Sequence, residues 1–382
     1  MGPFRLAAST ALVLVLAACG ESQATPAPSA HPAAPPATSH AAPRRAAADP
    51  GPARPLVGDP AHTAALTRVW IATAVDDGPA EAGPIRARAG QRVTLFAVLE
   101  AGAATYSDAP RLRRGRAIVS PRPLAAAPGA ELRWAKVEPE AANLSNTTSG
   151  SFRFEAIPYR AVDLPAAAGH GHVAADVHPT LTPDHGHGLG TMRFQLEARQ
   201  GERVVRSPGA DSRRGRGAGG LSADVHRVSI RRDDTFLGYL TEMYGQPYIW
   251  ASAGTSPNNH QSEHLEGSDC ADLMVYGARR AGLRLPYSWT GDLPRVTRLL
   301  GRGEHGDDGV YRDRRGQPVP FTRPGDLVLF PRHVGALVED RAPLGQLDTG
   351  DIMMHTLFDS PKEQAIADSG YADNVVEVRR WR

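Results

Sequence analysis

A single cysteine in the second half of the chain, Cys270, has the surroundings of a nucleophile. Residues 271–281 carry apolar side chains at helical spacing, end in two arginines and precede Gly282, which together indicate a helix and its end. Cys270 therefore lies at the predicted start of a helix, where free backbone N–H groups and the helix dipole favour a thiolate. The sequence predicts a reactive thiol with a lowered pKa. A buried, inert cysteine is the alternative.

Two histidines follow on predicted strands. Residues 323–330 read as a turn and an apolar strand, His333 begins a second strand, and residues 351–358 read as a third strand that contains His355. Because successive strands usually pair, we expect the second and third strands to bring His355 near His333. A thiol, an imidazole base and a second imidazole that orients the base are the groups needed for acyl transfer through a covalent intermediate. A further short helix is predicted at 235–244.

Four motifs in this part of the chain resemble, in their order, those of NlpC/P60-family cell-wall peptidases. They are Tyr248-Ile249-Trp250-Ala251-Ser252, Asp269-Cys270-Ala271-Asp272-Leu273, the run 325–335 that ends in His333-Val334-Gly335, and Met353-Met354-His355. The resemblance implies a papain-like α+β fold for residues 233–382. It also implies that Cys270 is the nucleophile, His333 its base, His355 the residue that orients the base, and Tyr248 an aid to the oxyanion. The implied reaction is hydrolysis of amide bonds in peptidoglycan stem peptides, without a cofactor.

The sequence departs from this family pattern beside the nucleophile and beside the tyrosine. Ala271 and Asp272 replace a Ser-Gly pair, and Ala251 and Ser252 replace two glycines. The stretches that separate the nucleophile and the two histidines are also longer than usual. Asp272 has two interpretations: it changes the charge presented to a substrate, or it is a solvated surface residue.

The N-terminus predicts export and lipidation. Residues 1–5 are weakly basic, residues 6–16 are apolar, and Leu16-Ala17-Ala18-Cys19 resembles a bacterial lipobox. The apolar run is too short for a lasting membrane span, which needs about 20 residues. We therefore expect residues 1–19 to be a lipoprotein signal, Cys19 to carry lipid, and the protein to be anchored in the cell envelope. In an organism with two membranes we expect the outer membrane, facing the periplasm. Cys270 is then a lone thiol in an oxidising compartment.

The remaining segments position the predicted site. Residues 20–60 are rich in Ala, Pro and Ser and predict a disordered tether. Residues 61–232 alternate short apolar runs with Gly and Pro, which favours an all-β domain, an immunoglobulin-like sandwich. Its expected strands are 65–73, 92–99, 131–137, 151–157, 191–199 and 225–231. Basic clusters at 111–116 and 213–216 lie beside Gly and Pro and are interpreted as solvated loops.

Two groups of histidines raise the question of a metal ion. The loop 166–190 carries His170, His172, His178, His185 and His187, with Asp176 and Asp184 nearby, and a second group consists of His260, Glu263 and His264. Imidazole pairs at such spacing are able to bind a divalent ion. No predicted strand fixes the first group, and Asn and Gly residues flank the second. We therefore expect flexible loops and no metal site.

The overall charge excludes one class of partner and leaves three functions. The formal net charge is +2, so nothing indicates a nucleic-acid-binding surface. The leading hypothesis is an envelope-anchored peptidoglycan hydrolase that is bound to the membrane through its lipid. The alternatives are a non-catalytic lipoprotein that binds the wall or a partner, and a papain-like cysteine hydrolase or acyltransferase with another substrate. The complete Cys/His/His set favours catalysis, but it does not separate the first hypothesis from the third.

Overall fold

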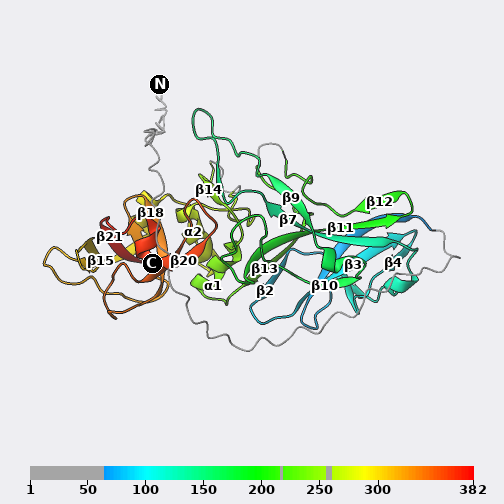
Figure 1. Ribbon diagram of the computed structural model, residues 1–382, viewed down its shortest axis with the longest axis horizontal. Helices are drawn as coiled ribbons and strands as arrows, with labels where there is room; N and C mark the ends of the chain where they lie inside the picture. Colours follow the sequence, from blue (N-terminus) through cyan, green and yellow to red (C-terminus); the bar gives the residue numbers. More distant parts are fainter. Residues whose placement is uncertain (1–63, 216–217, 255–259) are drawn as a thin grey trace, which may run out of the picture. The chain divides into compact units, whose positions relative to one another are not determined.

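The computed structural model describes residues 64–215, 218–254 and 260–382 (Figure 1). These residues belong to one compact unit, Pro52–Arg382. The predicted signal segment, Cys19 and the tether at 20–60 lie outside the described residues. No helix in the described part is long and apolar enough to cross a membrane. The domain boundary expected near Arg232 stays a prediction.

The part before Arg232 consists of strands and two short 3-10 turns. The elements are β1 (Leu66–Val75), β2 (Ile85–Arg88), β3 (Val93–Ala101), β4 (Ala104–Tyr106), β5 (Leu112–Arg114), β6 (Ala117–Val119), η1 (Leu124–Ala126), β7 (Glu131–Pro139), β8 (Asn143–Ser145), β9 (Tyr159–Asp163), η2 (Pro165–Ala167), β10 (His172–Ala174), β11 (Gly190–Gln200), β12 (Arg203–Arg206) and β13 (His226–Arg231). One sheet has the order β1-β3-β10, with β4 beside β3. A second has the order β2-β13-β11-β7-β9, with β12 beside β11, and β2 runs parallel to β13.

These two sheets share one hydrophobic core. Leu95 and Leu99 from β3, Trp134 from β7, and Phe194 and Leu196 from β11 are all buried in the same cluster. Strands cover five of the six expected segments. The exception is 151–157, which is an extended loop with a single bridge from Arg153 to Thr147. Its apolar side chains are spaced as in a strand because they are buried, not because they join a ladder.

The part after Arg232 contains the helices and a third large sheet. The elements are α1 (Phe236–Leu240), η3 (Thr241–Met243), β14 (Tyr248–Trp250), α2 (Cys270–Arg280), η4 (Thr290–Asp292), α3 (Leu293–Val296), β15 (Thr297–His305), β16 (Tyr311–Arg312), β17 (Leu327–Phe330), β18 (His333–Glu339), β19 (Ile352–His355), β20 (Lys362–Ala365), η5 (Ile366–Ser369) and β21 (Val376–Trp381). The sheet has the order β16-β15-β21-β17-β18-β19-β20. The strand β14 pairs instead with β8, so it ties this part to the preceding one.

Both faces of the large sheet are covered. On one face Leu327, Val334 and Met354 share a core with Leu273 and Met274 of α2, and Figure 1 shows α2 near β18. The intervening residues of β17, Val328 and Phe330, belong to a second core on the other side. Burial on both faces explains why β17 is a continuous apolar run without alternation.

The expected fold class is wrong. The described part is mainly β on both sides of Arg232: strands hold 39% of the described residues and helices 12%, and the C-terminal sheet curls into a half-barrel. A papain-like α+β domain behind an immunoglobulin-like sandwich is therefore not what the chain forms. The two helical patterns in the sequence do form α1 and α2, but beyond Gly282 the chain supplies all the strands of the large sheet. In the described part α2 is the one helix longer than five residues.

Candidate functional site

The first turn of α2 places Cys270 at the start of the helix. Asp269 is the N-cap residue, and its carboxylate accepts a hydrogen bond from the Asp272 N–H at 2.9 Å. Arg279 and Arg280 lie in the last turn, where positive charge interacts favourably with the dipole. The capping position and the basic end fix the helix register, and therefore the position of Cys270 beside β18.

The two histidines meet as the strand pattern predicted. Strands β18 and β19 pair antiparallel, with Leu337 opposite Met353. Nε2 of His333 and Nδ1 of His355 lie 2.7 Å apart, and both side chains are buried, at 0% and 1% exposed. Within the described residues, Nδ1 of His333 and Nε2 of His355 have no hydrogen-bond partner. Each ring of the pair thus keeps one buried nitrogen free to bond another group.

A backbone N–H and one aromatic ring connect the thiol with the histidine pair. The backbone N–H of Val334, next to His333, donates a hydrogen bond to the Cys270 thiol. The Tyr371 ring stacks on His333 at 4.6 Å between centroids, and its pKa is raised by burial and by the neighbouring Cys270. No motif in the sequence marks Tyr371, which lies in a loop after η5. Its role becomes visible only once the sheet is assembled.

Tyr248 lies beside the nucleophile as the motif predicted. It begins β14, pairs through its backbone with Ser268 in the segment that leads to Cys270, and is 3% exposed. Burial, and then the neighbouring Cys270 and Asp269, raise the pKa of its phenol, so the hydroxyl stays protonated and available as a donor. The Phe358 ring packs edge-on against it at 5.5 Å. Phe358 is 66% exposed and has a left-handed backbone, φ 53°.

The departures from the family pattern contact one another. Ser252 accepts a hydrogen bond from the Asp269 N–H at 3.0 Å and donates one to the Asp272 carboxylate. Asp272 is 2% exposed, so its interpretation as a solvated surface residue is wrong. Ala251 has φ 58°, a conformation in which glycine is unstrained and alanine is not. The serine and the second aspartate therefore form one buried polar link under the first turn of α2.

The thiol does not have the lowered pKa that the sequence predicted. Burial is the main cause that raises the pKa of Cys270, and the charge of Asp269 adds to it. Burial also raises the pKa of Asp269 to about 6 and that of Asp272 well above its usual range. The helix dipole is thus outweighed by the loss of water and by two carboxyl groups. The buried thiol is neutral at physiological pH.

The histidines are neutral as well. Burial lowers the pKa of His333 to about 3. Burial, and then the charges of His333 and Lys362, lower that of His355 well below its usual range. General-base catalysis starts from a neutral thiol and a neutral imidazole, and in it the proton leaves sulfur as the sulfur attacks. The arrangement is not a preformed thiolate-imidazolium pair.

The histidines of the loop at 166–190 go to separate partners. His178 Nδ1 lies 2.6 Å from the Asp184 carboxylate, whereas His185 Nε2 lies 2.9 Å from Asp359, just beyond β19. In the part of the chain that the structure describes, no three His, Cys, Asp or Glu side chains gather as a metal site would require. The loop instead ties the first half of the chain to the segment that follows His355.

The comparisons with known proteins give this site no name. No protein-family model matches the chain, and no curated protein matches it.

Proposed function

We propose that the protein is an envelope-anchored cysteine hydrolase that cleaves stem-peptide amide bonds of peptidoglycan. The observation that carries the proposal is the buried 2.7 Å contact between His333 and His355, which leaves Nδ1 of His333 free next to the strand residue that contacts the Cys270 thiol. A buried imidazole pair whose proposed base has a free nitrogen, together with a thiol that contacts the same strand, fits acyl transfer. The motif resemblance to NlpC/P60 peptidases supports the choice of substrate.

The proposed reaction begins with proton transfer. For Nδ1 of His333 to accept the thiol proton, Nε2 must carry a hydrogen and donate it to Nδ1 of His355, which fixes the tautomers of both rings. The sulfur of Cys270 forms a bond to the amide carbonyl carbon, and the carbonyl oxygen becomes an oxyanion. His333 then gives its proton to the leaving amine as the C–N bond breaks. This step leaves a thioester on Cys270.

Water completes the cycle. His333 takes a proton from the water, whose oxygen attacks the thioester, and the departing sulfur regains a proton as the acid is released. The Asp269 carboxylate accepts hydrogen bonds from the N–H groups of Ala271 and Asp272, so these two donors of the first helical turn are engaged. We therefore assign oxyanion stabilisation to the Tyr248 hydroxyl, whose proton is retained.

The proposed location follows from the lipobox. Lipid on Cys19 and a tether at 20–60 place the folded part at a membrane surface, within reach of the wall polymer. Metabolic labelling with a fatty-acid analogue tests this directly. We expect label on the wild-type protein and none on Cys19→Ala. Label retained in Cys19→Ala would refute the anchor without touching the proposed chemistry.

The test of the proposed function is digestion of purified peptidoglycan with identification of the products by mass spectrometry. We expect new stem-peptide fragments from the wild-type protein and none from Cys270→Ala. Fragments produced equally by both proteins would refute the nucleophile assignment. The absence of fragments from both, together with hydrolysis of a different amide or ester substrate, would replace the proposed substrate.

One observation favours a second candidate function, binding without catalysis. Cys270 is 8% exposed, its pKa is raised, and Nδ1 of His333 makes no hydrogen bond with any described residue, the thiol included. An inert site of this kind would support a wall-binding protein. Sedimentation with insoluble peptidoglycan separates the candidates: retention without fragment release, unchanged in Cys270→Ala, identifies a binding protein.

A further inference from the structure

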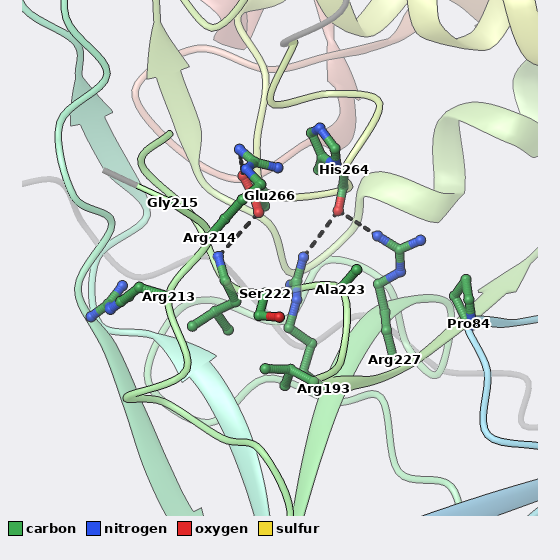
Figure 2. Close-up of a pocket in the computed structure, with 12 residues that line it drawn as sticks. Pro84, Arg193, Arg213, Arg214, Gly215, Ser222, Ala223, Arg227, His264 and Glu266 are labelled. Atoms are coloured by element: carbon green, nitrogen blue, oxygen red, sulfur yellow. Dashed lines mark hydrogen bonds and ion pairs between the residues drawn. The ribbon is translucent and has the colours of Figure 1, made fainter. Parts of the chain in front are cut away.

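A cavity of about 330 Å³ lies away from the thiol site, among β11, β13, the loop residues 213–215 and 221–223, and the segment 264–266 (Figure 2). It is far larger than the roughly 30 Å³ that one water molecule occupies in the liquid. Neither Cys270 nor its two histidines line it. The cavity is therefore separate from the proposed catalytic groups.

Four arginines dominate its wall. They are Arg193, Arg213, Arg214 and Arg227. Among the described residues, the only carboxylate within ion-pair distance of any of them is Glu266, 2.9 Å from Arg214. Four positive charges against one negative charge leave the lining with an excess of three. Such an excess in a partly buried space attracts anions, because the low-dielectric walls screen it poorly.

The guanidinium groups are held in place by neutral acceptors. Arg193 donates to the backbone carbonyls of His264 at 3.1 Å and Leu265 at 2.9 Å, and Arg227 donates to the same His264 carbonyl at 2.6 Å. Figure 2 shows that carbonyl oxygen between the two guanidinium groups, with Arg214 and Glu266 beside them. Carbonyl oxygens orient these cations without neutralising them. The site is thus preorganised and remains positive.

Several donors in the cavity wall have no acceptor. Nε and Nη1 of Arg214 and Nε of Arg227 are buried and lack a hydrogen-bond partner within the described residues. A buried donor left unsatisfied costs on the order of 1–3 kcal/mol, more for a charged group. Guanidinium donors are arranged as a fork that matches the oxygens of a carboxylate or a phosphate. The unsatisfied N–H donors and the excess positive charge both favour an anion with such oxygens.

We propose that this cavity binds the oxyanion group, carboxylate or phosphate, of a small molecule. The alternative is that the arginines serve only to hold the segment 264–266 against β11 and β13. That role explains the bonds to backbone carbonyls, but it explains neither the size of the cavity nor the donors without acceptors. The proposal does not depend on the chemistry at Cys270.

Titration calorimetry on the full chain in detergent tests the proposal. Inorganic phosphate and acetate are the two probes, and sodium chloride at equal ionic strength is the blank. We expect saturable binding of at least one probe and none of chloride. The probe that binds more tightly shows whether the cavity prefers a tetrahedral phosphate or a planar carboxylate.

Variants with opposite expected effects separate binding from structural support. Arg227→Gln removes a charged donor, and we expect affinity to fall by about tenfold to a hundredfold. Glu266→Gln removes the one carboxylate among the described residues that line the cavity, and we expect affinity to rise. Arg298→Gln, an equal charge change on an exposed residue of β15, should leave binding unchanged. If Arg227→Gln does not fold, Arg213→Gln on the exposed rim takes its place.

The proposal would be overturned if neither probe bound saturably to the wild-type protein. It would also be overturned if the arginine variant bound as tightly as the wild type, or if Arg298→Gln weakened binding as much as the cavity variant does. None of these outcomes bears on Cys270, because the assay measures no hydrolysis.

Discussion

The neutrality of His333 can be tested through the stability of the whole fold. Burial lowers the pKa of this histidine to about 3, against an ordinary value of 6.5. The folded state therefore binds fewer protons than the unfolded chain between these two values, so stability is full above pH 6.5 and declines as the pH falls towards 3. At pH 5 this one residue lowers the free energy of unfolding by about 2 kcal/mol. The pH is then about 1.5 units below the pKa of the unfolded histidine, and each unit corresponds to about 1.36 kcal/mol.

The assay is urea denaturation of wild type and His333→Gln at pH 8 and pH 5. We expect wild type to lose about 2 kcal/mol more than the variant on acidification. His226→Gln is a matched comparison: His226 is buried in the first half of the chain, bonded to Thr73 and Ala82, and burial lowers its pKa to about 4. The same subtraction gives about 2 kcal/mol for it at pH 5. An unchanged pH dependence in His333→Gln would refute the neutral imidazole and, with it, the general-base step.

Three further predictions concern the elements around the site. Ala251→Gly should stabilise the fold by about 0.5–1 kcal/mol in urea denaturation, because it removes an alanine with a left-handed backbone. A variant less stable than wild type would show that the Ala251 backbone is not strained. Asp326→Asn, just before β17, should destabilise the fold by roughly 2 kcal/mol. The reason is that the buried Asp326 carboxylate accepts hydrogen bonds from Arg380 at 2.6 and 2.7 Å. An unchanged melting temperature would contradict this prediction. Asp269→Asn keeps a capping side chain but removes the charge that helps to raise the pKa of Cys270, so iodoacetamide should alkylate the thiol faster at pH 8. Equal rates would show that burial alone controls the thiol.

Local sequence patterns predicted the parts of the site that depend on nearest neighbours. The start of α2 at Cys270 follows from apolar spacing and terminal charges, and the approach of His355 to His333 follows from the pairing of successive strands. These features need only a helical period, turn residues and short connections. They could be predicted because they depend on residues that are close together in the sequence.

The remaining features depend on contacts between distant segments. The link from Ser252 to Asp272 and the stacking of Tyr371 on His333 join residues whose patterns carry no sign of each other. The thiol pKa was mispredicted for the same reason, since burial is a property of the assembled fold. Arg214 was interpreted as part of a solvated loop, yet its side chain is 19% exposed and lines the cavity. The predicted fold class was wrong because periodicity identifies strands without showing which sheet they join.

We propose that Cys270 attacks an amide carbonyl with His333 as its base. The most direct test is the rate of stem-peptide release from purified peptidoglycan by wild type, Cys270→Ala and His333→Gln, with Arg298→Gln as a control. We predict that each of the first two variants lowers the rate by at least about a thousandfold, that the control keeps it, and that all fold. Release of stem peptides by Cys270→Ala at the wild-type rate would show that Cys270 is not the nucleophile.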